Sequence, residues 1–116
     1  MARILIVDNE SMVLSLFESL LTPLGHEVLT ASSGRMGVEV YQRHRPTATI
    51  LELNLPDING VEVLTQIRAV NPHAPVLIWT VADTKGLEQE ARHRRVTEFL
   101  IKGFSPHELS AALQGC

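Results

Sequence analysis

The sequence predicts an α/β fold, a doubly wound three-layer sandwich in which helices cover both faces of a five-stranded parallel sheet. Short runs rich in Ile, Leu and Val alternate five times with longer amphipathic segments, no hairpin signal joins two runs, and three runs are almost continuously apolar. Strands buried on both faces have such runs, and right-handed crossovers place the helices on both faces. The 116 residues are too few for an eight-stranded α/β barrel, so we expect one domain over residues 1–116.

The strands are predicted from the five apolar runs. Their expected ranges are 3–8, 27–30, 47–53, 75–80 and 96–102. Trp79 lies within the fourth run, and we expect its ring in the core.

Helical spacing of apolar residues predicts the first three helices. The first, over 10–22, carries two adjoining apolar rows, Met12-Leu16-Leu20 and Val13-Phe17-Leu21. The second is expected over 33–43, with Ser32 or Ser33 as its N-cap and an inner face formed by Met36, Val40 and Tyr41. The third is expected over 61–70.

The last two helices have weaker or more local signals. The fourth, over about 84–94, has only Leu87 and Ala91 as an apolar face, and the basic run ARHRR at its end is interpreted as solvated. The fifth begins at Ser105, because Pro106 suits the first helical turn and Glu108 completes a capping box.

Composition excludes several classes of protein. The formal net charge of −3 argues against direct nucleic-acid binding. The single cysteine, Cys116, allows no intrachain disulfide, and no apolar run is long enough to cross a bilayer, so we expect a cytoplasmic protein without membrane contact. No G-x-G-x-x-G motif follows the first strand, which argues against a dinucleotide site.

Polar residues stand at the ends of four predicted strands. They are Asp8 with Asn9, Glu52 with Asn54, Thr80 and Lys102. Any one of them alone is explained by solvation or helix capping. Because functional groups of an open parallel sheet gather at the carboxyl ends of its strands, the set predicts one shared site.

Four segments resemble the motifs of one family. They are RILIVDNE, LELNLPDINGVEVL, VLIWTVAD and EFLIKGFSP. In this order and spacing the chain resembles, from end to end, the response-regulator receiver domain of two-component phosphorelay signalling. The resemblance implies a flavodoxin-like (βα)5 sandwich with strand order 2-1-3-4-5 and a signalling protein that is not an enzyme.

The resemblance assigns roles unevenly at the first and third strand ends. Asp8 matches the first member of an acidic pair that holds Mg²⁺, and Asn9 stands where the second acid, a direct ligand, is expected. Glu52 occupies the position of the aspartate that accepts a phosphoryl group from a histidine kinase. Asn54 matches a position whose main-chain carbonyl ligates the metal.

The later motifs match more closely. Thr80 matches the switch hydroxyl, Phe99 the aromatic residue that follows its movement, and Lys102 the phosphate-binding lysine. Val81 replaces the usual small residue after the hydroxyl, and Gly103 replaces the usual proline after the lysine.

The two departures at the acidic positions change the expected chemistry. An amide at Asn9 removes one anionic ligand, and Mg²⁺ is a hard ion that dehydrates reluctantly, so we expect its binding to Asp8, Glu52 and Asn54 to be weak or absent. Glu52 extends about 1.5 Å beyond an aspartate, one C–C bond, which misplaces a nucleophile whose reaction depends on positioning.

Three hypotheses remain open at this stage. In the first, Glu52 with Lys102 partly mimics the phosphorylated state. In the second, the pocket is vestigial and the domain is a constitutive interaction module. In the third, Glu52 or Asp57 still accepts phosphate.

The resemblance also implies partners. These are a sensor histidine kinase or another signalling protein, and a dimer or output surface made by the fourth helix, the fifth strand and the fifth helix.

Overall fold

A computed structural model describes residues 2–80, 89, 91, 92, 94 and 96, together with the backbone of 98–101. Five strands form one sheet in the order β2-β1-β3-β4-β5, and every neighbouring pair is parallel. The strands are β1 (Arg3–Val7), β2 (Glu27–Ala31), β3 (Ala48–Leu51), β4 (Val76–Thr80) and β5 (Glu98–Ile101). This order confirms the predicted doubly wound fold.

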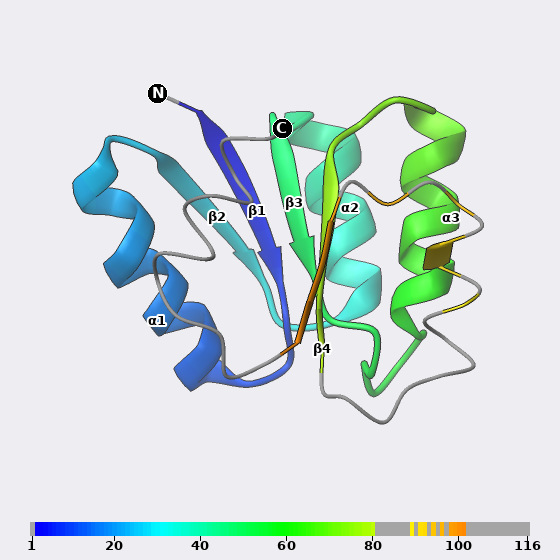
Figure 1. The fold of residues 1–116 in the computed structure, drawn as a ribbon, viewed down its shortest axis with the longest axis horizontal. Helices are drawn as coiled ribbons and strands as arrows, with labels where there is room; N and C mark the ends of the chain where they lie inside the picture. The colour runs from blue at the N-terminus through cyan, green and yellow to red at the C-terminus, as the bar shows by residue number, and fades with distance from the viewer. Residues whose placement is uncertain are drawn as a thin grey trace.

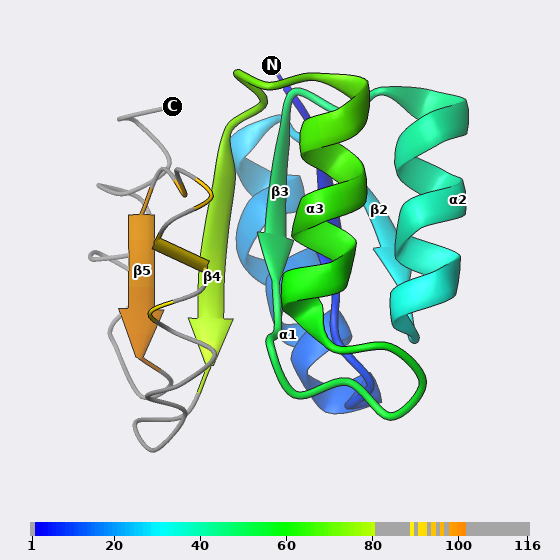
Figure 2. The ribbon, with the colours of Figure 1, turned by 90° about the vertical axis from the view of Figure 1, so that its right-hand side faces the viewer.

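The helices lie in two layers (Figures 1 and 2). Helix α1 (Ser11–Leu21), followed by the short 3-10 turn η1 (Thr22–Leu24), covers one face of the sheet, and α2 (Gly34–His44) and α3 (Gly60–Val70) cover the other. Beyond β4, residues 89, 91 and 92 are helical. The rest of the predicted fourth helix and all of the fifth lie outside the described residues.

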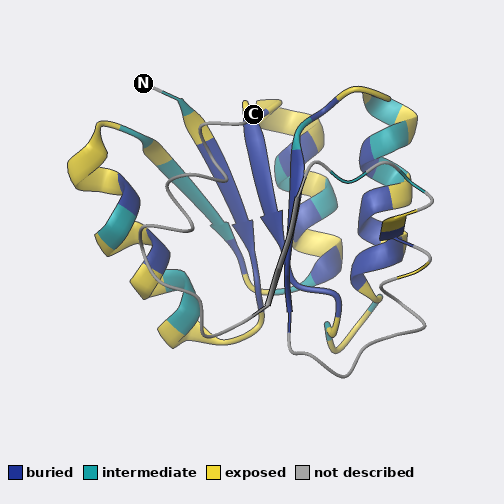
Figure 3. Ribbon diagram, viewed as in Figure 1, coloured by how far each residue is buried: buried dark blue, intermediate teal, exposed yellow. Residues whose placement is uncertain are grey.

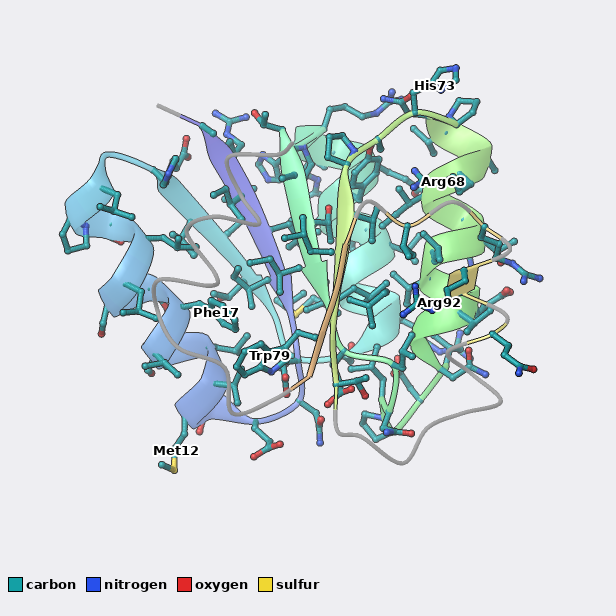
Figure 4. All side chains as sticks on the ribbon, viewed as in Figure 1. Met12, Phe17, Arg68, His73, Trp79 and Arg92 are labelled. Carbon is teal, nitrogen blue, oxygen red and sulfur yellow. The ribbon has the colours of Figure 1, made fainter. Side chains whose placement is uncertain are left out.

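The sheet separates two apolar clusters, which appear as the buried strands and inner helix faces in Figure 3. On the α1 side, Phe17 and Trp79 meet edge to face, with ring centroids 4.9 Å apart (Figure 4). Trp79 is only 7% exposed, which confirms the prediction that it is a core residue. On the other side, Ala91 packs fully buried among the residues of α3 and β4.

Not all of the apolar residues that predicted the first two helices are buried. Of the two rows on α1, Phe17 and Leu21 are buried, whereas Met12 and Leu16 are 82% and 47% exposed. On α2, Tyr41 is buried, but Met36 is exposed. Apolar residues span a wider arc of each helix than the sheet covers, so periodicity alone did not identify which of them are buried.

Helices and strands begin and end within two residues of the predicted positions. Two of the differences lie at strand ends where a side-chain carboxylate bonds to the main chain of the next loop. Ser33 caps α2, because its hydroxyl accepts the N–H of Met36 at 3.1 Å, as predicted. Helix α3 starts one residue early, at Gly60, after Asn59 as its cap. Strands β1 and β3 end before Asp8 and Glu52, whose carboxylates bond to the main chain of the following loops.

Within the described part of the chain, no helix is both long enough and apolar enough to span a bilayer.

Candidate functional site at the carboxyl edge of the sheet

Three of the predicted site residues meet at one edge of the sheet. Asp8, Glu52 and Thr80 lie at the carboxyl ends of the neighbouring strands β1, β3 and β4, where Val7 pairs with Leu51. The N–H of Glu52 donates to the carbonyl of Val7 at 3.0 Å, which fixes the first two strand ends side by side. All three residues are buried, with exposures of 1%, 4% and 0%.

The carboxylate of Glu52 turns back onto the loop that follows it. Its Oε2 accepts the N–H of Leu53 at 2.7 Å and the N–H of Asn54 at 3.2 Å. Two successive main-chain N–H groups that point at one oxygen form a small seat for an anion, and such bonds stabilise a buried carboxylate in its charged form. Glu52 is therefore a buried, hydrogen-bonded carboxylate rather than a solvated strand end.

Asp8 and Asn9 separate at the end of β1. The Oδ1 of Asp8 accepts the N–H of Glu10 at 2.9 Å, so the buried carboxylate shapes the turn into α1. Asn9 is exposed. The end of β1 thus carries one buried carboxylate and one neutral residue at the surface.

The hydroxyl of Thr80 is fully buried at the end of β4. It has no hydrogen-bond partner among the described residues. Burying a hydroxyl without a hydrogen-bond partner lowers the stability of the fold by about 1–3 kcal/mol. The Thr80 hydroxyl would therefore gain from an acceptor placed beside it.

The remaining predicted site residues are only partly described. In β5, the backbone of Phe99 pairs with that of Ile78 in β4, and the backbone of Ile101 pairs with that of Thr80. Lys102 follows Ile101 in the sequence but lies outside the described residues. Asn54 is exposed and contributes its N–H to Glu52.

Gly60 fixes the loop that carries Glu52. Its N–H donates to the carbonyl of Leu53 at 2.8 Å, and a Cβ there would stand 2.7 Å from Leu53 Cα and even closer to the carbonyl oxygen of Glu52. Only glycine lets the first turn of α3 pack this tightly on the site's main chain.

Asp57 has a role that sequence reasoning missed. Its two carboxylate oxygens accept the N–H groups of Gly34 and Arg35, each at 2.9 Å, so it caps α2 from the β3–α3 loop. The Arg35 N–H is the main cause that lowers the pKa of the Asp57 carboxyl to about 2. Because Asp57 is far from α2 in sequence, no local pattern signalled this contact.

Among the described residues, no group of three or more His, Cys, Asp or Glu side chains is placed to hold a metal ion. Asp8 and Glu52 are the anionic groups at this edge, and each already accepts main-chain N–H bonds.

Helix α1 presents an apolar strip beside this edge. Met12, labelled in Figure 4, and Leu16 are exposed there. They line a surface hollow with Ser15 and Ser19.

Comparison with known proteins gives a consistent match. The sequence model of the response regulator receiver domain family matches residues 4–114. The chain is 27% identical over 112 residues to the chemotaxis protein CheY of Thermotoga maritima, covering 96% of this chain and 93% of the relative. It is 31% identical over 117 residues to the alkaline phosphatase synthesis transcriptional regulatory protein PhoP of Bacillus subtilis, covering 97% of this chain but 47% of that regulator.

A solved structure gives the same match. The fold superposes on a response regulator receiver domain protein from Clostridium thermocellum with a TM-score of 0.92 at 30% identity, covering 98% of this chain and 92% of the other.

Proposed function

Because the chain belongs to the response regulator receiver family of two-component systems, we propose that it signals through protein–protein contacts, with Glu52 as a partial, built-in substitute for the phosphoryl group. The proposal is one of binding and not of catalysis. We expect it to act in the cytoplasm, with a histidine kinase or another signalling protein as partner.

The seat of Glu52 is the observation that carries the proposal. A buried carboxylate, held by the N–H groups of Leu53 and Asn54, lies at the strand end where the family resemblance places the phosphoacceptor. Thr80, on the neighbouring strand, supplies a buried hydroxyl that needs an acceptor. The substitution is partial, since a carboxylate has two oxygens and one charge whereas a phosphoryl group has three oxygens and nearly two charges.

Lys102 is the cation that we expect to complete this arrangement. It follows Ile101, the pairing partner of Thr80. A direct charge-assisted contact with Glu52 would contribute about 1.5–3 kcal/mol toward the active arrangement.

Mg²⁺ does not fit the donors well. Octahedral coordination needs several hard oxygen ligands, and this edge offers two carboxylates, Asp8 and Glu52, with the neutral Asn9 at the surface. One oxygen of each carboxylate already accepts a main-chain N–H. We therefore propose that Mg²⁺ binding is weak or absent and that signalling does not depend on it.

Exposed features support contact with a protein. The strip of Met12 and Leu16 on α1 leaves apolar surface uncovered next to the site. From the family resemblance, we also propose the surface of the fourth helix, β5 and the fifth helix for a dimer or an output partner.

The decisive comparison is between the native chain and Glu52→Gln, which keeps the shape and removes the charge. If Glu52 acts as a phosphoryl substitute, the amide NMR signals of Thr80 and of β5 will shift together with those of Leu53 and Asn54. Shifts confined to Leu53 and Asn54 would favour the vestigial pocket, in which the domain is a constitutive interaction module.

Phosphotransfer is tested separately. The protein is incubated with Mg²⁺ and acetyl phosphate, and its intact mass is measured. We expect no adduct on the native chain, while Glu52→Asp, which restores the family's acceptor, provides the control. A stoichiometric gain of about 80 Da on Glu52 or Asp57 would overturn the proposal in favour of a working phosphoacceptor.

A further inference from the structure

A second polar cluster joins α3 to the chain segment that precedes β5. Arg68 Nε donates to the carbonyl of Arg94 at 2.8 Å, and Arg68 Nη1 donates to the carbonyl of Ala74 at 2.6 Å. In return, Arg94 Nε donates to Thr65 Oγ1 at 2.8 Å. We name these four residues (Thr65, Arg68, Ala74 and Arg94) the arginine clamp.

The clamp is reciprocal, because each arginine reaches the other's segment. Thr65 and Arg68 stand one turn apart on α3, and the hydroxyl of Thr65, which accepts from Arg94, donates to the carbonyl of Val61 at 2.9 Å. Arg68 also ties the loop before β4, so one side chain connects three segments; it projects from the upper part of α3 in Figure 4. The guanidinium donates both bonds from a rigid planar group, whereas the three donors of a lysine ammonium sit on one rotatable nitrogen and do not reproduce the separation between Nε and Nη1.

The segment held by the clamp has an apolar anchor as well. Ala91 is fully buried in the core cluster on the α3 side, and its carbonyl accepts the N–H of Arg94 at 2.9 Å. Ala91 is therefore fixed by packing, and Arg94 by charge-assisted hydrogen bonds. They lie in sequence between Thr80, the last residue of β4, and Glu98, the first residue of β5.

We propose that Arg68 is a positioning residue. It holds Ala91 and Arg94, which lie between β4 and β5 in sequence, against α3, and so positions the surface that a partner would contact. This inference rests on the proposed function in so far as that surface is the output face.

The test is hydrogen–deuterium exchange of the full chain, followed by mass spectrometry. In Arg68→Met and Arg68→Lys, we expect amides of peptides covering 89–98 to exchange at least about tenfold faster, with no change in peptides covering 52–60. Thr65→Val removes the acceptor of Arg94 together with the local bond to the Val61 carbonyl within α3, but leaves both bonds of Arg68, so it should give a smaller increase at the same place. Arg43→Met is the matched control, because Arg43 is an exposed α2 arginine paired only loosely with Glu39, at 3.5 Å.

Two results would overturn the inference. One is unchanged exchange over 89–98 in both Arg68 variants. The other is equal acceleration over 89–98 and 52–60, which would make Arg68 a general support of the fold. If lysine restores full protection, charge alone suffices and the role of the guanidinium fork is refuted. These outcomes are independent of the Glu52→Gln comparison, whose signal is read at Thr80 and β5 in a chain with Arg68 intact.

Discussion

Gly60→Ala tests whether the seat of Glu52 depends on the close approach of α3. The added methyl carbon would overlap the carbonyl oxygen of Glu52 and stand 2.7 Å from Leu53 Cα, well inside van der Waals contact. Both neighbours are main-chain atoms, and they cannot rotate aside as the end of a side chain can. Their positions are restrained by the bond from Glu52 N–H to Val7 and by the bond from Gly60 N–H to the carbonyl of Leu53. The clash must move the loop that carries the site.

The expected loss follows from this geometry. Overpacking a rigid contact costs about 1–3 kcal/mol, and the helical preference of alanine, up to about 1 kcal/mol within a helix, recovers little at the first residue of α3. With a urea dependence of about 1.5–2 kcal/mol per molar for a domain of this size, a loss of about 2 kcal/mol lowers the unfolding midpoint by roughly 1 M.

The assay is urea unfolding followed by the fluorescence of Trp79, the only tryptophan, which packs on Phe17 in the opposite core cluster. Amide NMR signals of Leu53 and Asn54 report the seat itself and should shift in the folded variant. Gly25→Asn is the control, because nothing lies within 4 Å of its added carbon and asparagine tolerates the left-handed conformation found there. A Gly60→Ala midpoint within roughly 0.2 M of the native value would refute the reasoning.

Three further predictions concern the surroundings of the site. Asp57→Asn should flatten the acid dependence of stability: the folded pKa of about 2 lies below the ordinary value of 3.8, so the contribution of Asp57 is complete above pH 4 and is lost as the pH falls toward 2, as urea midpoints across this range will measure. Phe17→Leu should lose about 1–2 kcal/mol in thermal or urea unfolding, part of it from the edge-to-face contact with Trp79, and should change the emission of that ring. Thr80→Val should leave stability unchanged or raise it by about 1 kcal/mol, because the buried hydroxyl has no partner among the described residues; a marked loss in urea unfolding would contradict this.

The fold and the location of the site could be predicted because their signals are local. Apolar runs such as 76–80 identify buried strands without knowledge of their neighbours, and parallel strands bring their carboxyl ends to one edge. Asp8, Glu52 and Thr80 therefore converge as expected. The strand order and the roles of these residues came from the family resemblance, since periodicity does not determine which strands are neighbours.

The contacts that fix the site could not be predicted, because they join residues distant in sequence. Asp57 looked like an alternative phosphoacceptor, and only the folded loop brings it to the first turn of α2. Arg94 belongs to a basic run that was expected to be solvated, yet it reaches Thr65 on α3. In both cases the side chain's partner is a main-chain or hydroxyl group, a type of contact that leaves no pattern in composition.

The site contains the polar groups that stability alone would not keep. Leucine or valine at the positions of Glu52 and Thr80 would remove a buried carboxylate and a buried hydroxyl, two kinds of group that are costly to take out of water. The structure instead holds that loop rigid from two sides, through the Asp57 cap on α2 and the close contact at Gly60. Because the loop is fixed, the N–H groups of Leu53 and Asn54 stay directed at one oxygen of Glu52, and the side chain stays buried. Local violations of stability rules, supported by rigid surroundings, are expected where a side chain is retained for signalling.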